Sequence, residues 1–174
     1  MTELRRPEPL DPERHDRSSF DSGSADLDEW LRRYSTQNRR RNTAATWVIA
    51  DADMVVVAYV SLAMASIDRG SAPPSVAKHA PDPVPALLIG RLAVDRSHAG
   101  LGVGTVLVAH VFATAVDLND RVARRAVVVA AALDDDARSW WQRLGFNPFD
   151  PADQDNLDLY LITSEIEATL RSLG

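Results

Sequence analysis

Apolar residues near the N-terminus recur three and four positions apart, the spacing that gathers side chains on one face of an α-helix. They are Leu27, Trp30, Leu31 and Tyr34. Ser24 is a suitable N-cap, and Asp26, Asp28 and Glu29 would lie at the positive end of the helix dipole. The pattern predicts a helix from residue 24 to about residue 40. The first twenty residues are read as extended chain that docks on the core around Leu10 and Phe20.

Two segments rich in Val, Ile, Tyr and Trp follow, residues 46–50 and 54–67. Asp51-Ala52-Asp53 separates them, so we expect a β-hairpin with one short and one long arm. Residues 68–85 hold five of the ten prolines and are expected to form a loop. A loop of this length inside a compact domain is often functional.

The second half of the chain alternates between strand and helix patterns. The run 86–94 is apolar at nearly every position, as in a strand covered on both faces, and a glycine-rich segment and a helical pattern through residues 107–115 come next. We further expect a strand at 126–131, a helix at 134–144 that Gly145 ends with Phe146 tucked back, a strand at 157–162 and a helix at 164–173.

Length and composition place the chain among ordinary globular proteins. With 174 residues, 45 % hydrophobic and 25 % charged, one domain over 1–174 is expected. Cysteine is absent and the four histidines are scattered, so we expect no metal. The sequence has neither a membrane-length apolar run nor a signal-peptide stretch, which predicts a cytoplasmic protein without membrane contact. Every cation except Lys78 is arginine, a bias typical of a GC-rich bacterial genome.

The glycine-rich segment carries the clearest chemistry. Gly100, Gly102 and Gly104 stand at the start of a predicted helix, where glycine lets the backbone approach a ligand and unpaired N–H groups can bind a pyrophosphate. The same spacing also occurs as simple turn chemistry. No Gly-Lys-Ser/Thr closes the segment and no GxGxxG is present, which excludes a P-loop and a dinucleotide fingerprint.

Three strings together resemble a known family: FDSGSADLDEWLRR, RLAVDRSHAGLGVGTVLV and DDDARSWWQRLGF. In this order, over residues 18–163, they are similar to the GNAT superfamily of acetyl-CoA-dependent N-acetyltransferases. The first string is closest to bacterial toxins that acetylate aminoacyl-tRNA. The resemblance implies an α/β fold with a mixed, mostly antiparallel central sheet, splayed between two parallel strands, and helices on both faces.

The resemblance also implies the coenzyme contacts. The strand residues Leu92, Ala93 and Val94 would pair with the pantetheine arm of acetyl-CoA. The pyrophosphate would be held by the loop and first helical turn, namely Ala99, Gly100, Leu101, Gly102, Val103, Gly104 and Thr105. The family usually has Gln or Arg where this chain has Ala99. Loss of one side-chain donor should weaken coenzyme binding by about 1 to 3 kcal/mol without abolishing it.

A second departure concerns catalysis. The toxin branch has a tyrosine that protonates the departing thiolate, and this chain has Trp141 at that position, next to Trp140. Indole donates a hydrogen bond but is no acid near neutral pH, and a positioned acid is worth on the order of 10² to 10⁴ in rate. A thiol with a pKa near 8.5 leaves tolerably as its anion, so a slow enzyme is expected. Ser139, Tyr160 and His79 are weaker candidates for the acid, each equally explained by capping, packing or surface polarity.

Four arginines of the first predicted helix, Arg32, Arg33, Arg39 and Arg40, fall within one exposed arc. They suit RNA phosphates, although a solvated helix end would carry the same residues. A net charge of −6 argues against indiscriminate polyanion binding. The leading hypothesis is acetylation of aminoacyl-tRNA by a toxin, with a ribbon-helix-helix antitoxin and a homodimer implied by the resemblance. The alternatives are acetylation of a small amine or protein amino group, and an acyl-CoA-binding module without catalysis.

Overall fold

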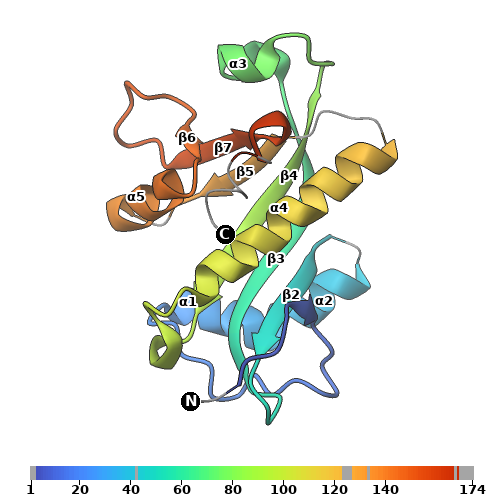
Figure 1. Ribbon diagram of the computed structural model, residues 1–174, viewed down its shortest axis with the longest axis vertical. Coiled ribbons are helices and arrows are strands. Elements are labelled where there is room, and N and C mark those ends of the chain that lie inside the picture. Colours follow the sequence, from blue (N-terminus) through green and yellow to red (C-terminus); the bar gives the residue numbers. More distant parts are fainter. Residues whose placement is uncertain (1–2, 42, 123–126, 133, 167, 169–174) are drawn as a thin grey trace. The chain divides into compact units, whose positions relative to one another are not determined.

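The computed structural model describes residues 3–41, 43–122, 127–132, 134–166 and 168. Its contacts divide the chain into two compact units. The first contains Met1–Ala63 and Gly90–His110, and the second contains Met64–Ile89 and Val111–Gly174. The residue ranges of the two units divide within the long elements β3, β4 and α4, so each of these elements contributes residues to both units (Figure 1).

Fifteen elements are described. They are β1 (Glu8–Pro9), α1 (Ala25–Glu29), η1 (Trp30–Tyr34), α2 (Ser35–Arg40), β2 (Ala45–Ala50), β3 (Val56–Ile67), η2 (Arg69–Ser71), α3 (Pro74–Ala77), β4 (Val84–Val94), η3 (Arg96–His98), α4 (Val103–Val122), β5 (Val127–Ala131), α5 (Asp135–Arg143), β6 (Asn147–Pro148) and β7 (Asp158–Ile162).

The strands form one sheet in the order β1-β2-β3-β4-β5-β7-β6. The pairs β1–β2, β2–β3, β5–β7 and β6–β7 are antiparallel. The pair β4–β5 is parallel and runs from Ala86 opposite Val127 to Ile89 opposite Ala130. The mixed, mostly antiparallel sheet expected from the resemblance is therefore confirmed.

In the first unit, the apolar core joins the N-terminal segment and the first helix to the hairpin. Leu10 and Phe20 are buried against Trp30, Leu31 and the strand residues Val48, Val56, Tyr59 and Ala93. On the opposite face of β2, Trp47 contacts His110 of α4 with ring centroids 4.3 Å apart. Helices therefore cover both faces of the sheet in this unit, because successive strand residues point to opposite sides.

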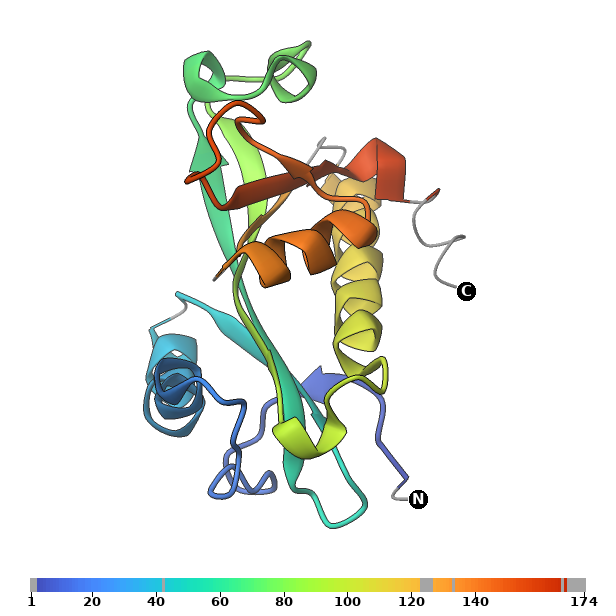
Figure 2. The ribbon, with the colours of Figure 1, turned by 90° about the vertical axis from the view of Figure 1, so that its left-hand side faces the viewer.

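In the second unit, the segment 68–85 packs on one face of the sheet and is not an open loop. It contains the short elements η2 and α3, and α3 lies at the tip where β3 ends and β4 begins (Figures 1 and 2). Val76 and Ala80 pack against Val84, Val127 and Tyr160. The opposite side chains, including Val128, Ala130, Leu159 and Leu161, are also buried, so the strands are covered on both faces.

Most boundaries predicted from the sequence are confirmed within two residues. Ser24 caps α1 by accepting from the Leu27 N–H, and Gly145 ends α5 at φ +98° while the Phe146 N–H donates to the Trp141 carbonyl. Residues 163–166 are helical, but most of the closing helix expected at 164–173 lies outside the described residues, as does Ala126. No described helix combines the length and apolar character that crossing a bilayer requires.

The prediction that Tyr34 lies on the buried face of the first helix is wrong. The helix is continuous from Ala25 to Arg40, but Trp30–Tyr34 form a π-helical turn. The Ser35 N–H bonds to the Trp30 carbonyl, five residues back, so Ser35 takes the inward position that α-helical spacing assigns to Tyr34. Ser35 is fully buried, whereas Tyr34 is 44 % exposed.

Candidate functional site

The glycine loop, residues 99–105, connects β4 to α4. Gly100 and Gly102 have φ of +75° and +81°, and a Cβ at either position would meet nothing within 4 Å. Glycine is therefore needed there for backbone conformation and not for space. Val103 and Gly104 are buried, while Ala99, Gly100, Leu101 and Gly102 face solvent.

The amides of this loop are ready to bind an anion. Among the described residues, the N–H groups of 100–105 have no acceptor in hydrogen-bonding geometry. A helix N-terminus leaves its first N–H groups unpaired, and the helix dipole adds partial positive charge at the same end. The amides of this loop, with two glycines in left-handed conformation, suit a pyrophosphate, and binding there stays a prediction.

Asp95 fixes the chain just before the loop. Its carboxylate accepts from the Ser97 N–H at 2.9 Å and the Ser97 hydroxyl at 2.6 Å. Its second oxygen accepts from the Asp21 N–H at 2.9 Å, and the Arg96 N–H returns a bond to the Asp21 carbonyl. Burial alone would raise the pKa of Asp95, but these bonds, with His98 nearby, hold it below its usual value. Asp95 therefore joins the glycine loop to the segment around Asp21.

The neighbouring strand residues Leu92, Ala93 and Val94 belong to the last part of β4. Ala93 is buried in the core with Trp30 and Tyr59, so Leu92 and Val94 point to the opposite side of the strand. Arg91 places its guanidinium 4.7 Å from the centroid of the Trp30 ring. These contacts keep the strand in place, and its role toward pantetheine stays a prediction.

Helix α5, in the second unit, carries Trp141 as a packed aromatic residue. The Asp134 carboxylate caps the helix by accepting from the Ala137 N–H. Trp141 is 5 % exposed and makes edge contacts with Trp140 at 4.9 Å and Phe146 at 5.0 Å. Phe146 in turn stacks on Phe112 at 5.8 Å. The structure thus gives Trp141 a packing role, and its role toward the coenzyme stays a prediction.

The three weaker candidates for the proton donor have local explanations. The Ser139 hydroxyl donates to the Asp135 carbonyl within α5. The Tyr160 hydroxyl is paired with the Ser75 hydroxyl at 2.9 Å, and the Tyr160 ring is buried against Phe149. His79 is exposed at a turn position with φ +59°. These contacts favour anchoring of α3 as the role of Tyr160.

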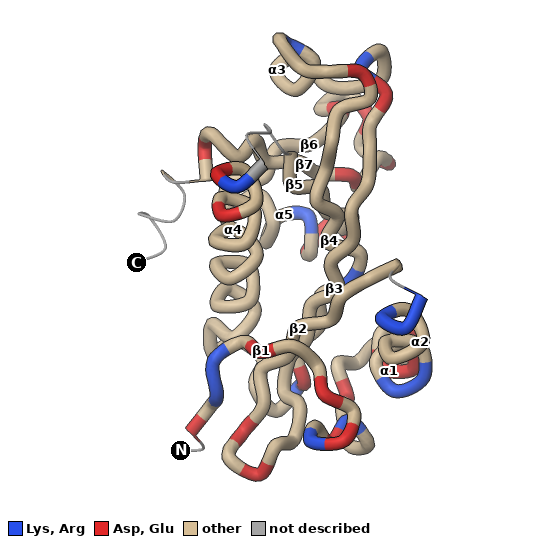
Figure 3. The backbone as a smooth tube through the Cα atoms, turned by 90° about the vertical axis from the view of Figure 1, so that its right-hand side faces the viewer, with Lys and Arg blue, Asp and Glu red and all other residues tan. Residues whose placement is uncertain are grey.

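The four arginines predicted to form one stripe divide into two kinds. Arg32 donates to the Phe20 carbonyl at 2.9 Å, and Arg39 donates to the Leu10 carbonyl at 2.5 Å. Both therefore fasten the N-terminal segment to the helix. Arg33 forms an exposed ion pair with Glu29 at 3.2 Å, and Arg40 is exposed. Figure 3 shows basic positions on the first helix, and the four arginines belong to η1 and α2.

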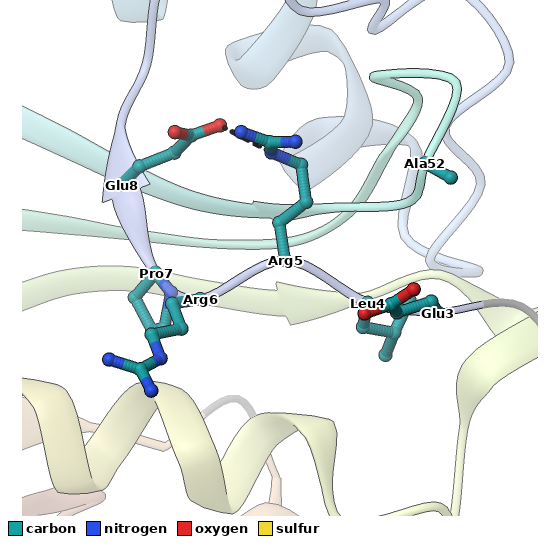
Figure 4. Close-up of a pocket in the computed structure, with 7 residues that line it drawn as sticks. All are labelled: Glu3, Leu4, Arg5, Arg6, Pro7, Glu8 and Ala52. Atoms are coloured by element: carbon teal, nitrogen blue, oxygen red, sulfur yellow. Dashed lines mark hydrogen bonds and ion pairs between the residues drawn. The ribbon is translucent and has the colours of Figure 1, made fainter.

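Two cavities are lined by residues outside the glycine loop. One, of about 660 Å³, is lined by the N-terminal segment from Glu3 to Glu8 and by Ala52. Arg5 turns to Glu8 at 3.4 Å while Arg6 points away from both (Figure 4). The other, of about 520 Å³, lies in the second unit, and its lining includes Ala86, Leu88 and Val129 of the sheet together with Asp68 and Asp158.

Sequence reasoning missed the residues that fix backbone by long-range bonds. Asp95 accepts a hydrogen bond from the Asp21 N–H, and Arg17 donates one to the Leu31 carbonyl in the π-helical turn. The spacing Asp95-x-Ser97 was a usable signal, because an aspartate that accepts from the N–H two residues on is a common turn. The described residues contain no cluster of His, Cys, Asp and Glu that could hold a metal ion.

Comparison with known proteins supports the resemblance. Residues 5–146 match the Acetyltransferase (GNAT) family. A tRNA-acetylating toxin of Mycobacterium tuberculosis (strain ATCC 25618 / H37Rv) is 34 % identical over 157 residues, which cover 89 % of this chain and 90 % of that protein.

Solved structures agree with this match. AtaT complexed with acetyl-methionyl-tRNAfMet is similar with a TM-score of 0.84 and 26 % identity, over 95 % of this chain and 98 % of that one. AtaTR bound with AcCoA is similar with a TM-score of 0.79 and 25 % identity, over 95 % and 96 %. Acetyl-CoA is the co-substrate of the family, and the unpaired amides of the glycine loop fit its pyrophosphate. The chain belongs to the GNAT family of acetyltransferases.

Proposed function

We propose that the chain transfers the acetyl group of acetyl-CoA to the amino group of aminoacyl-tRNA, as a toxin and as a single catalytic domain. The observation that carries the coenzyme half is the row of unpaired amides at residues 100–105. The acceptor half is supported by the relatives, which include a tRNA-acetylating toxin and a toxin complexed with acetylated tRNA. The basic positions of η1 and α2 add a surface suited to phosphates.

In this proposal, backbone groups of the chain bind acetyl-CoA. The N–H groups of the glycine loop hold the pyrophosphate, with Ala99 contributing no side-chain donor. The backbone of Leu92, Ala93 and Val94 pairs with the pantetheine arm, as in the family. Asp95 keeps the strand and the loop in register through its bonds to Ser97 and Asp21. Acetyl-CoA supplies an activated thioester when bound.

Proton transfer is the weak part of the site. Trp141 occupies the position of the family's tyrosine, and its indole can donate a hydrogen bond but cannot protonate a thiolate. We therefore propose that acetyl transfer is slow and that the leaving thiolate departs largely unassisted. An α-amine of pKa about 8 is partly unprotonated at neutral pH, so the acceptor needs only modest help from a base.

The direct experiment is incubation with labelled acetyl-CoA and bulk charged tRNA, followed by measurement of label on the RNA. We expect label that requires aminoacylation and disappears after the ester is hydrolysed. Label on uncharged tRNA, or none on charged tRNA with acetyl-CoA bound, contradicts the proposal. A panel of small amines and protein N-termini tests the second acceptor class. Coenzyme binding without turnover on any acceptor would favour the acyl-CoA-binding module, which the Trp141 substitution also fits.

Arg33 and Arg40 carry the proposed RNA contact, because Arg32 and Arg39 are bonded to backbone carbonyls. Charge reversal at Arg33 and Arg40 should weaken tRNA binding and flatten its salt dependence, since the slope falls with the number of phosphates that the protein neutralises. The matched control is Arg32→Gln with Arg39→Gln, which should instead lower the melting temperature. Equal salt slopes for wild type and the reversed variant would rule out this role for Arg33 and Arg40.

Two partners follow from the same proposal. AtaT, a solved neighbour, is also known bound to the C-terminus of its antitoxin AtaR. We infer a ribbon-helix-helix antitoxin for this chain and a homodimer in solution, both as the resemblance implies. Growth arrest on expression, relieved by co-expression of a small neighbouring gene, tests the antitoxin. Light scattering of the purified chain measures the oligomeric state.

A further inference from the structure

The π-helical turn Trp30–Tyr34 changes what the first helix shows to solvent. Its extra residue puts Ser35 inside and leaves Tyr34 with 44 % of its surface exposed. Few large hydrophobic side chains of the described residues are this exposed. A single exposed aromatic ring is ordinary on a protein surface, so its meaning depends on the residues around it.

The half-buried guanidinium of Arg17 bonds to the π-helical turn. Arg17 donates to the Leu31 carbonyl, the Ser35 hydroxyl and the Thr36 hydroxyl, each at 3.2 Å. The Ser35 hydroxyl also donates to the Leu31 carbonyl at 2.7 Å. The Leu31 carbonyl therefore accepts from two side chains. The outward position of Tyr34 is fixed by these bonds.

The other side of the turn is equally constrained. Trp30 stacks on Tyr59 with centroids 5.7 Å apart and planes 12° apart. The Tyr59 hydroxyl donates to the Leu27 carbonyl at 2.7 Å. After the turn, the Asn38 side-chain amide donates to the Tyr34 carbonyl at 2.9 Å. The backbone that carries Tyr34 is thus held on both sides of the turn.

The surroundings of Tyr34 are basic. Residues 30–41 contain five arginines and no acidic residue, although the chain as a whole carries −6. Arg33, Arg40 and Arg41 are exposed around the helix. Arg41 and the exposed Gln37 follow Tyr34 at seven and three positions, so they share its helix face. One face therefore offers a ring, an amide and a guanidinium in line.

We propose that Tyr34 is a stacking residue for an unpaired nucleotide of RNA, with Arg33 and Arg41 contacting the flanking phosphates. Single-stranded nucleic acid is bound by aromatic side chains that stack on bases within a basic surface. A duplex buries its base faces and cannot use the ring. The inference rests on the proposed function, because the aminoacylated end of tRNA is an unpaired strand.

The test compares two RNA probes by fluorescence anisotropy: a short unstructured oligonucleotide and a blunt duplex of the same sequence. Tyr34→Ala should lower affinity for the single strand roughly 5- to 100-fold, the range expected when one base–aromatic stack is removed, and leave the duplex unchanged. Tyr34→Trp should retain single-strand binding. The control is Met64→Ala, another exposed large apolar side chain, which should change neither affinity.

Other results overturn the inference. Equal single-strand affinity for wild type and Tyr34→Ala does so, as does an equal loss of affinity for both probes. A changed oligomeric state of Tyr34→Ala with unchanged RNA binding would mark the face as a protein contact instead. Binding needs no acetyl transfer, so the stacking role and the proposed function fail separately. Tyr34-dependent single-strand binding without acetylation of charged tRNA would overturn the proposed function and leave the stacking role standing.

Discussion

The glycine loop and helix α5 differ in which atoms carry their chemistry. At residues 99–105 the proposed ligand-binding groups are main-chain N–H donors, set by two glycine conformations and a helix end. On α5 the proposed catalytic position is a single side chain, the buried Trp141. A backbone site tolerates a change such as Ala99, whereas a side-chain site can be abolished by one substitution. On this proposal, coenzyme binding and catalytic rate respond to different substitutions.

The largest effect should come from restoring an acid on α5. Trp141→Tyr supplies a phenol that can protonate the departing thiolate, so kcat should rise on the order of 10²-fold. Single-turnover acetyl transfer at saturating acetyl-CoA measures it, with the coenzyme Kd expected to stay unchanged. Trp140→Tyr, its neighbour on the same helix, should give no gain. An unchanged rate in Trp141→Tyr with a stable fold would show that position 141 has no part in proton transfer.

Adding one methyl group to the glycine loop, in Gly102→Ala, should weaken acetyl-CoA binding. Gly102→Ala meets no steric obstacle, but a residue with a Cβ at φ +81° costs roughly 1 to 2 kcal/mol. The Kd for acetyl-CoA, measured by calorimetry, should rise about tenfold with kcat little affected. Gly70→Ala is the matched control, since Gly70 also has open space but lacks a positive φ. Equal Kd values for both variants would contradict a need for this loop conformation in coenzyme binding.

Asp95→Asn should have a smaller effect on the same region. The amide cannot accept from both the Ser97 and the Asp21 N–H groups, so one hydrogen bond disappears and the Kd for acetyl-CoA should rise a few-fold. The pKa of Asp95 lies below its unfolded value near 4, so its contribution to stability is full above that pH and disappears as the pH falls further. In urea unfolding between pH 6 and about 3, the Asp95→Asn variant should lose less stability than the wild type as the pH falls. Parallel curves would rule out this role.

The smallest effect is expected on the sheet face of the second unit. Tyr160→Phe removes the bond to Ser75 and should cost about 0.5 to 1.5 kcal/mol of unfolding free energy. Ser75→Ala should match it, and kcat and its pH profile should be those of wild type. A fall in kcat on the order of 10²-fold in Tyr160→Phe alone would identify Tyr160 as the missing acid and reverse the contrast between the two regions.

Local patterns predicted the elements well because their causes are local. The cap at Ser24, the glycine conformations at 100 and 102 and the end of α5 at Gly145 each depend on a few neighbouring residues. The π-helical turn could not be predicted, since it depends on Arg17, whose guanidinium arrives from outside the helix. For the same reason, the sequence could not separate Arg32 and Arg39, which bind carbonyls of the N-terminal segment, from the exposed Arg40.

The two outermost strands have a consequence for how copies of this chain can associate. β1 and β6, at the ends of the strand order, have two residues each, and both end in proline, at Pro9 and Pro148. Proline has no N–H to offer a neighbouring chain, and so short a strand presents almost no ladder to extend. The sheet is thereby guarded against edge-to-edge aggregation. Any dimer must be formed through side-chain surfaces instead of by continuing the sheet from one molecule into the next.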